Sequence, residues 1–241
     1  MKNLISLIAA SSVLLLPASA QEGEGYGFLN IANLIPGDVP CEISIGGENL
    51  VPDGLQSGTY TGWFMVKTGP KDMEVSLNEF QEGSGTIQIT EGEGKLIGIY
   101  LEPDKRTNSE GRPYPPRIRI RSFPIYETRG YGLKFVSLYP EHTRFQLGPL
   151  KIEAKPFDPV EIPNWNGGGF EISSNGKPAG TVTGSSEGGA FYLLVGTDAG
   201  GGNAAVLVSA NKQEVPAYLR KQKPAPQAPA PAPETPAPQQ P

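Results

Sequence analysis

Gly25-Tyr26-Gly27 opens the apolar run Phe28-Leu29-Asn30-Ile31-Ala32-Asn33-Leu34, and the same tripeptide returns 105 residues later as Gly130-Tyr131-Gly132 before Leu133-Lys134-Phe135-Val136. A repeat of about a hundred residues is too long for a solenoid unit and matches the size of a β-sandwich that folds by itself. The spacing therefore predicts two similar β units in tandem.

Short apolar runs between Gly- and Pro-rich turns predict seven strands in each unit and an all-β protein. The first unit is expected to form strands over residues 28–34, 42–45, 63–67, 73–77, 86–89, 96–101 and 117–123. The second unit repeats this layout over residues 133–139, 144–147, 150–155, 170–173, 180–183, 191–195 and 204–209. Alternation is clearest in Met73-Glu74-Val75-Ser76-Leu77, where one face of the strand is apolar and the other is polar.

The first unit resembles a known family in its opening strand, Phe28 to Asp38, and in the stretch that continues to Gly47. It is similar to a secreted bacterial immunoglobulin-like domain of unknown function, whose first strand typically ends in His-Ala-Ser-Pro-Asp-Ala-Pro. Pro36 and Gly47 fall at the family's spacing, whereas Asn33 stands where the family usually has His. The resemblance covers about residues 26–102 and more faintly 131–209. It implies two immunoglobulin-like antiparallel β-sandwich domains, 21–125 and 126–220, with no established catalytic role.

The compositions of the two chain ends predict that these residues lie outside the two domains. Residues 1–20 carry Lys2, an apolar run and Ala18-Ser19-Ala20, which predicts a cleaved signal peptide and an exported protein, periplasmic, cell-surface or extracellular. Residues 221–241 are rich in Pro and Ala, which predicts a disordered, extended tail. No transmembrane segment is expected in the mature chain. Without the leader, nineteen Lys and Arg face twenty-five Asp and Glu, which argues against nucleic acid as a partner.

Candidate catalytic and metal motifs are present but incomplete. Gly184-Ser185-Ser186-Glu187-Gly188 matches a nucleophile elbow, yet a strand is expected after it, and the single histidine, His142, precedes it. Asp198 with Gly200 to Asn203 supplies too few oxygen ligands for calcium. The single cysteine, Cys41, is expected to be a buried small residue. We therefore predict no catalytic residue, no cofactor and no metal, and a protein that is not an enzyme.

Two features remain as candidate partner-binding sites. Arg117, Arg119 and Arg121 alternate with Ile118 and Ile120, so three guanidinium groups are predicted on one face of a strand, with Lys105, Arg106 and Arg112 upstream. Either the stripe binds an anionic glycan, lipid headgroup or protein partner, or it protects an edge strand against aggregation while Glu102, Asp104 and Glu110 neutralise it.

Trp165 stands in the polar loop Pro163 to Gly169, where its ring could stack on a sugar or pack between the units. Together these features predict an exported bacterial cell-envelope protein that acts as a non-catalytic binding or structural module. A carbohydrate-binding protein that uses Trp165 is the first alternative, and a hydrolase of envelope polymers is the second. The partner predicted by the sequence is an envelope glycan or a protein. The sequence makes no prediction of the oligomeric state.

Overall fold

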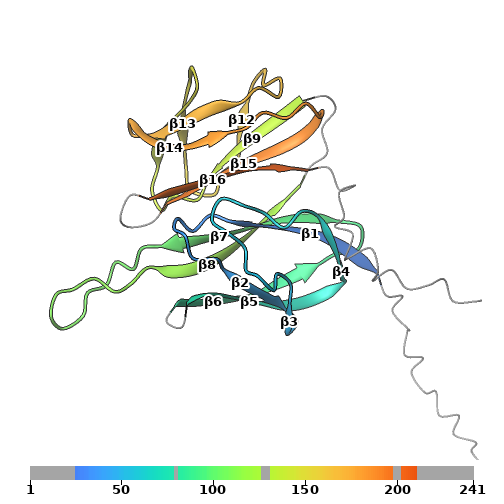
Figure 1. Ribbon diagram of the computed structural model, residues 1–241, viewed down its shortest axis with the longest axis vertical. Helices are drawn as coiled ribbons and strands as arrows, with labels where there is room; N and C mark the ends of the chain where they lie inside the picture. Colours follow the sequence, from blue (N-terminus) through green and yellow to red (C-terminus); the bar gives the residue numbers. More distant parts are fainter. Residues whose placement is uncertain (1–24, 79–80, 126–130, 198–201, 211–241) are drawn as a thin grey trace, which may run out of the picture.

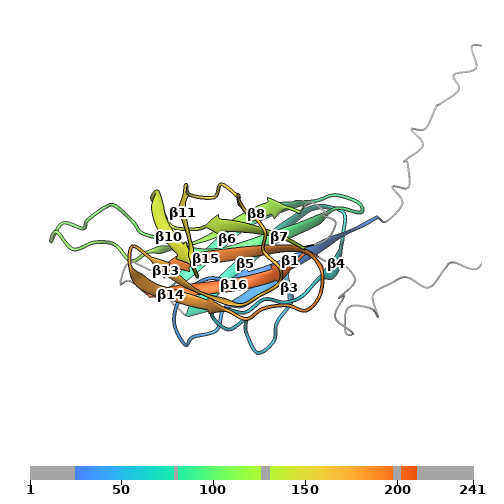
Figure 2. The same cartoon turned by 90° about the horizontal axis from the view of Figure 1, so that it is seen from above.

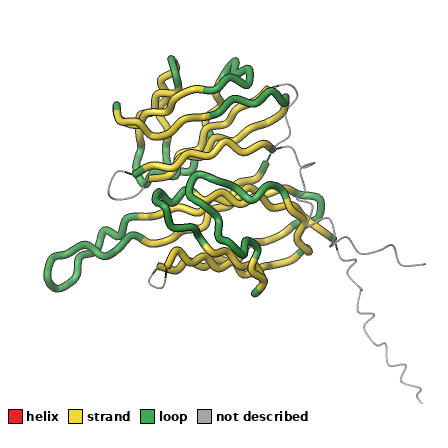
Figure 3. The backbone as a smooth tube through the Cα atoms, in the orientation of Figure 1, coloured by secondary structure: helices red, strands yellow, loops and turns green. Residues whose placement is uncertain are grey.

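The structure is a computed structural model that describes residues 25–78, 81–125, 131–197 and 202–210. The predicted signal peptide and tail lie outside the described residues. The described residues form sixteen strands and no helix, so the all-β prediction is confirmed (Figure 1, Figure 3). The first eight strands are β1 (Tyr26–Asn33), β2 (Glu42–Ile45), β3 (Glu48–Asn49), β4 (Phe64–Lys67), β5 (Gly69–Asn78), β6 (Gln81–Ile89), β7 (Gly94–Glu102) and β8 (Arg117–Pro124).

The second eight strands repeat the order of the first. They are β9 (Tyr131–Ser137), β10 (Thr143–Leu147), β11 (Leu150–Ala154), β12 (Val160–Ile162), β13 (Phe170–Ser174), β14 (Lys177–Val182), β15 (Gly189–Thr197) and β16 (Asn203–Ser209). The first unit has an inner sheet β4-β1-β7-β8 and an outer sheet β3-β2-β5-β6. Adding eight to each strand number gives the sheets of the second unit, inner β12-β9-β15-β16 and outer β11-β10-β13-β14. Each unit is therefore a pair of four-stranded sheets in the same topology.

The sheets are mostly antiparallel, as predicted, but each unit also has one parallel pair that the prediction of antiparallel sandwiches did not include. β1 runs parallel to β7, with Ile31 opposite Ile97, and β9 runs parallel to β15, with Phe135 opposite Leu193. Between these strands the chain crosses to the outer sheet and returns, so the later strand can enter from the same end as the earlier one. Hairpins account for antiparallel neighbours such as β13 and β14, whose Asn175-Gly176 turn has φ of 49° and 79°, as a type I′ turn requires.

The four sheets are stacked (Figure 1). Three clusters of buried side chains lie between them. One core lies inside each unit, around Leu29, Ile31 and Ile97 in the first and around Phe135, Phe145 and Leu193 in the second. The third cluster joins the two inner sheets to each other, and we call it the junction core. Its buried members are Ala32, Leu34, Leu96, Tyr100, Phe123, Val136, Leu138, Ala190, Tyr192, Leu194, Val206, Val208 and Ala210.

Glycines in the central strands allow the inner sheets to approach closely. A Cβ added to Gly196 in β15 would lie 2.5 Å from the backbone oxygen of Leu34, and one added to Gly98 in β7 would lie 2.9 Å from Leu138 Cδ2. Leu34 follows β1, and Leu138 follows β9, the strand that corresponds to β1. The contact is therefore reciprocal between the units. Trp63 closes one edge of the junction, where its Nε1 donates to the Ser209 carbonyl at 2.8 Å.

A long arm leaves this stack between β7 and β8. Residues 103–116 project away from both units in two perpendicular views (Figure 1, Figure 2). In the second unit, residues 198–202 make the equivalent connection between β15 and β16. The arm is thus an insertion that the sandwich topology does not require.

Candidate functional site

The site with the most varied chemistry is a cleft between the two units, beside the base of the arm. It encloses about 520 Å³. Side chains from β7, β8, the arm and the second unit all contribute to it, so neither unit forms it alone. We call it the arginine cleft, and its lining includes Tyr100, Glu102, Asp104, Lys105, Arg106, Arg117, Arg119, Leu138, Pro140, Glu141 and Phe157.

The arginines reach the cleft because β8 continues the face that builds the junction core. Leu96 pairs with Phe123 across β7 and β8, and both side chains are buried under the second unit. Further along the same face, Tyr100 pairs with Arg119 and Glu102 pairs with Arg117. The predicted arrangement of the arginines on one face is confirmed, since Ile118 points to the opposite face and into the first unit's core. β8 is also an edge strand, as the alternative interpretation of the stripe expected.

Acidic side chains contact the stripe closely. Asp104 accepts hydrogen bonds from Nε of Arg117 at 3.0 Å and from Nε and the NH2 nitrogen of Arg106 at 2.9 and 2.6 Å. The hydrogen bonds that Arg106 donates, first from its guanidinium and then from its backbone amide, hold the pKa of Asp104 below its usual value. Arg119 donates from Nε to Glu102 at 2.6 Å. The carboxylates fix the guanidinium groups in place, and Arg117 and Arg119 remain 45% and 47% exposed.

Arg121 leaves the row and stacks on an aromatic ring from the other unit. Its guanidinium carbon lies 5.0 Å from the centre of the Phe157 ring, which is a cation–π contact. The same ring lies 5.4 Å from Tyr100. Burial is the main cause that raises the pKa of Tyr100 above its ordinary value. Phe157 and Tyr100 thus form an aromatic floor under the charged groups.

Phe157 occupies a backbone conformation that bulky residues rarely adopt. Its φ is 63°, in the left-handed region, and its amide donates to the Ser137 carbonyl at 2.8 Å. Left-handed conformation costs an L-residue about 1–2 kcal/mol, and such positions gather at functional sites. The sequence Lys155-Pro156-Phe157-Asp158-Pro159 contains neither Gly nor Asn at this point, so the sequence analysis missed it.

The arm has an ordered backbone of its own. Thr107 pairs with Pro113, the amide of Asn108 donates to the Arg112 carbonyl at 2.8 Å, and the amide of Tyr114 donates to the Arg106 carbonyl at 3.1 Å. Arg106 also lies over the Tyr114 ring at 5.3 Å. Arg112, expected to join the stripe, instead lies at the tip of the arm beside Glu110. The sequence analysis missed this hairpin because prolines interrupt the segment. The turn residues Asn108-Ser-Glu-Gly111 at its centre are the signal that could have indicated it.

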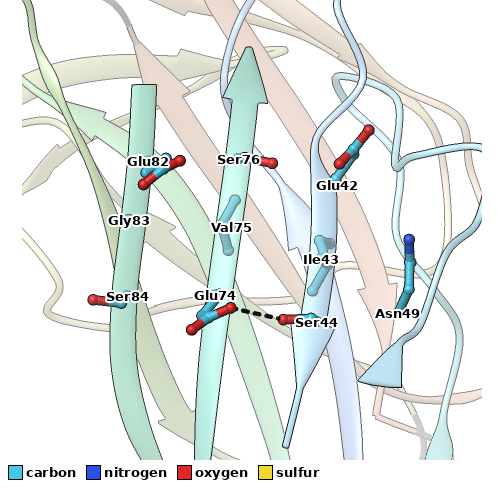
Figure 4. A pocket seen from close by; sticks show the side chains of 10 residues that line it. All are labelled: Glu42, Ile43, Ser44, Asn49, Glu74, Val75, Ser76, Glu82, Gly83 and Ser84. Atoms are coloured by element: carbon cyan, nitrogen blue, oxygen red, sulfur yellow. Dashed lines mark hydrogen bonds between the residues drawn. The ribbon is translucent and has the colours of Figure 1, made fainter. Parts of the chain in front are cut away.

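A second concave surface lies on the exposed face of the first unit's outer sheet (Figure 4). Glu42 and Glu82 flank Ser76 across β2, β5 and β6, and in the next row Ser44 and Ser84 flank Glu74. Ser44 Oγ donates to Glu74 at 3.4 Å. The hollow encloses about 590 Å³ and offers hydroxyl and carboxylate oxygens from the exposed face of the sheet.

Trp165 packs inside its own unit. Its ring meets Phe191 at 5.0 Å and Tyr131 at 5.9 Å, both edge to face, and its Nε1 donates to the Gly168 carbonyl at 2.8 Å. These contacts join it to the end of the second unit's core. Tyr131 begins β9, whereas Leu138 of the arginine cleft follows the end of that strand. The structure therefore does not bring Trp165 and the arginines together.

The nucleophile-elbow motif and the single histidine also lie apart. Ser186, which stands at the nucleophile position of the motif, precedes β15, and His142 follows β9. Because β9 and β15 are parallel, with Tyr131 opposite Gly189, these two loops lie at opposite ends of the sandwich. The Ser186 carbonyl accepts from the Tyr131 hydroxyl at 3.1 Å, and His142 Nε2 lies 3.8 Å from Glu153.

Cys41 is buried, as predicted, and burial raises the pKa of its thiol to about 12. Asp198, Gly200 and Gly201 of the weighed calcium motif lie outside the described residues. Within the described ranges, no three His, Cys, Asp or Glu side chains gather as metal ligands would. Nor does that part of the chain contain a helix with the length and apolar character to cross a membrane.

No protein-family model matches the chain. No curated protein is detectably similar to it.

Proposed function

We propose that the protein is an exported module of the bacterial cell envelope that binds an anionic partner, an envelope glycan or a protein, without catalysing a reaction. The observation that supports it most is the arginine cleft, where two half-exposed guanidinium groups and an aromatic floor meet between two units. Guanidinium groups are suited to carboxylate and phosphate recognition because they present several N–H donors in one plane.

Export and attachment are part of the proposal and rest on sequence. Residues 1–20 have the charged, apolar and small-residue regions of a signal peptide, and residues 221–241 have the Pro-rich composition expected of a spacer. We also propose that each unit is an immunoglobulin-like module of the family that residues 26–102 resemble. Two facing sheets with a parallel pair between the first and seventh strands support that assignment.

Capture of envelope components at low and high salt tests the binding function. Arg117→Gln/Arg119→Gln removes both half-exposed charges of the cleft but leaves Ile118 and Ile120 in the core. Arg144→Gln is the matched control, because Arg144 is also exposed and also donates to a carboxylate, that of Glu153, on the far outer sheet. We expect capture to weaken with salt and with the double variant and to persist in the control. If capture is the same at low and high salt and is unchanged in the double variant, the arginines do not bind the partner and serve only to protect the edge strand.

Fractionation of the source cells tests the localisation separately. We expect the protein in the periplasm, at the cell surface or in the medium, shorter than the full chain by the leader. A full-length protein that stays in the cytoplasm would contradict the export proposal.

A further inference from the structure

We infer that the arginine cleft binds a polysaccharide with carboxylated sugars, that is, a uronate-bearing glycan. This inference rests on the proposed function and names the ligand class of the same site. It follows from the combination of cations, carboxylates and aromatic rings in one cleft, and each kind of group restricts the ligand in a different way.

The guanidinium groups retain donors toward the cleft. The contacts with Asp104 use Nε and one NH2 nitrogen of Arg117, and the contact with Glu102 uses Nε of Arg119. A guanidinium carries five N–H donors, so each arginine can still donate to a ligand. The carboxylates hold the two arginines in a fixed geometry, which lowers the entropy that binding would otherwise cost. A carboxylate on the ligand is the natural acceptor.

The acidic residues of the cleft disfavour a densely charged polymer. Glu102, Asp104 and Glu141 lie among Lys105, Arg106, Arg117 and Arg119. A polymer with a charge every few backbone atoms, such as polyphosphate, or with several charges on each sugar, such as a highly sulfated chain, would place some of its charges beside these carboxylates. A glycan with sparser carboxylates can place hydroxyl groups there instead, because hydroxyls donate to carboxylate oxygens.

Phe157 is only partly buried and offers an apolar surface to the apolar face of a sugar ring, while Tyr100, buried in the junction core, packs against it. Phe157 keeps its ring beside Tyr100 and Arg121 although its own backbone is strained, with φ of 63°. A residue such as Asn or Gly would hold that backbone at a lower cost. Contacts of the Phe157 ring with the junction core and with a ligand would offset the cost of this backbone conformation.

Binding of the mature chain, residues 21–241, to three soluble polymers tests the inference. Polygalacturonate carries the carboxylates, its methyl-esterified form has the same backbone without them, and polyphosphate is a dense polyanion. Affinity electrophoresis and titration calorimetry measure the dissociation constants. We expect polygalacturonate to bind at least about tenfold more tightly than its ester, since one charge-assisted hydrogen bond accounts for that ratio. It should also bind more tightly than polyphosphate, because the carboxylates of the cleft repel a dense polyanion.

Two variants connect the binding to the cleft. Arg119→Gln should weaken polygalacturonate binding about tenfold, and Arg144→Gln should leave it unchanged. Phe157→Asn keeps a residue that accepts the left-handed backbone but removes the ring, so it should weaken binding, and thermal unfolding reports separately whether the junction survives. If both Phe157→Asn and Arg119→Gln bind like the wild type, the cleft is not the site and the inference is wrong.

The polymers also separate this inference from the proposed function. Tighter binding of polyphosphate than of polygalacturonate overturns the uronate assignment and leaves an anion-binding module. Equal binding of the esterified and free polymers overturns it as well, because the carboxylate is then not recognised. If none of the three binds while envelope components are still captured through Arg117 and Arg119, the uronate assignment alone is wrong. If neither occurs, both proposals are wrong.

Discussion

Cys41 provides a pH-dependent test at the scale of one residue. Its thiol has a pKa of about 12 in the folded protein, against an ordinary value of 9.0, because burial disfavours the thiolate. Below pH 9.0 both states keep the proton and the full stability is present. Between pH 9.0 and about 12 only the unfolded state releases it, so the free energy of unfolding should fall by about 1.4 kcal/mol per pH unit.

Urea unfolding at pH 8 and pH 10.5 of the wild type and of Cys41→Ala measures this effect. The raised pKa of Tyr100 acts in both proteins and cancels in the comparison. We expect the wild type to lose about 2 kcal/mol more than the variant over this interval. Equal losses in the two proteins would mean that the thiol is accessible in the folded state.

Sequence was informative at positions where a side chain's direction follows from strand periodicity. The common face of Arg117 and Arg119 was predicted in this way. The burial of Cys41 was predicted from its small apolar side chain instead. Phe157 was not, because its left-handed backbone depends on the turn around Pro156 and on contacts with the other unit. Asn33 is buried and fixes a loop by donating from Nδ2 to the Leu55 carbonyl at 2.8 Å.

At the scale of strands, Gly196 controls how closely β15 approaches the first unit. Gly196→Val would place carbon atoms against the Leu34 backbone, which cannot move like the end of a flexible side chain. We expect a loss of about 1–3 kcal/mol or more in the free energy of unfolding, as in other overpacked cores. Chemical denaturation is the measurement. Gly85→Val in β6 serves as the control, because its nearest non-neighbouring atom is 4.0 Å from an added Cβ, and a comparable loss there would contradict the role of close packing.

The arm supports a second prediction at this scale. Replacing residues 104–115 with three or four turn residues brings the β7–β8 connection to the length of the 198–202 connection. Because the arm is absent from the three buried cores, we expect the melting temperature to stay within about 4 °C of the wild type. Binding of anionic partners should weaken, since Lys105 and Arg106 are removed. A variant that no longer unfolds cooperatively would show that the arm is needed for the fold.

Strand prediction succeeded where the runs were long enough to show alternation. β3 and β12 were missed because two or three residues give no periodic signal, as at Glu48-Asn49. The parallel pairing of β1 with β7 was also beyond the sequence, since Ile31 and Ile97 are 66 residues apart and nothing local specifies their partnership.

At the scale of the whole molecule, the repeat was predicted but its register was not. In β1 the side chains of Leu29 and Ile31 enter the first unit's core, and in β9 those of Leu133 and Phe135 enter the second. These pairs are 104 residues apart, whereas the two Gly-Tyr-Gly tripeptides are 105 apart. A shift of one residue exchanges the faces of a strand, so the tripeptide indicates the repeat without aligning it.

The junction core predicts how the two halves behave when separated. Residues 21–125 and 126–241, produced as two chains, would each expose an apolar inner-sheet face that includes Leu34 and Leu96 in one and Val136 and Leu194 in the other. Exposed faces of this kind drive association. We expect each fragment alone to self-associate and to bind a hydrophobic dye, and an equimolar mixture to form a complex of one copy of each.

Size-exclusion chromatography with light scattering measures these states. Two monomeric fragments that bind no dye would mean that each inner sheet is stable in water and that the junction contributes little. Urea unfolding of the intact chain provides an independent comparison, since a strong junction makes the two units unfold together.

The reciprocal contacts of Leu34 with Gly196 and of Leu138 with Gly98 have a consequence for ancestry. Equivalent sheets that meet face to face are the mark of an isologous interface, the kind that joins the subunits of a symmetric homodimer. Gene duplication and fusion of a self-pairing ancestor would leave this arrangement in a single polypeptide. Once the copies were covalently joined, their sequences could diverge, and the arm and its arginines are found in the first copy, where the second has only residues 198–202.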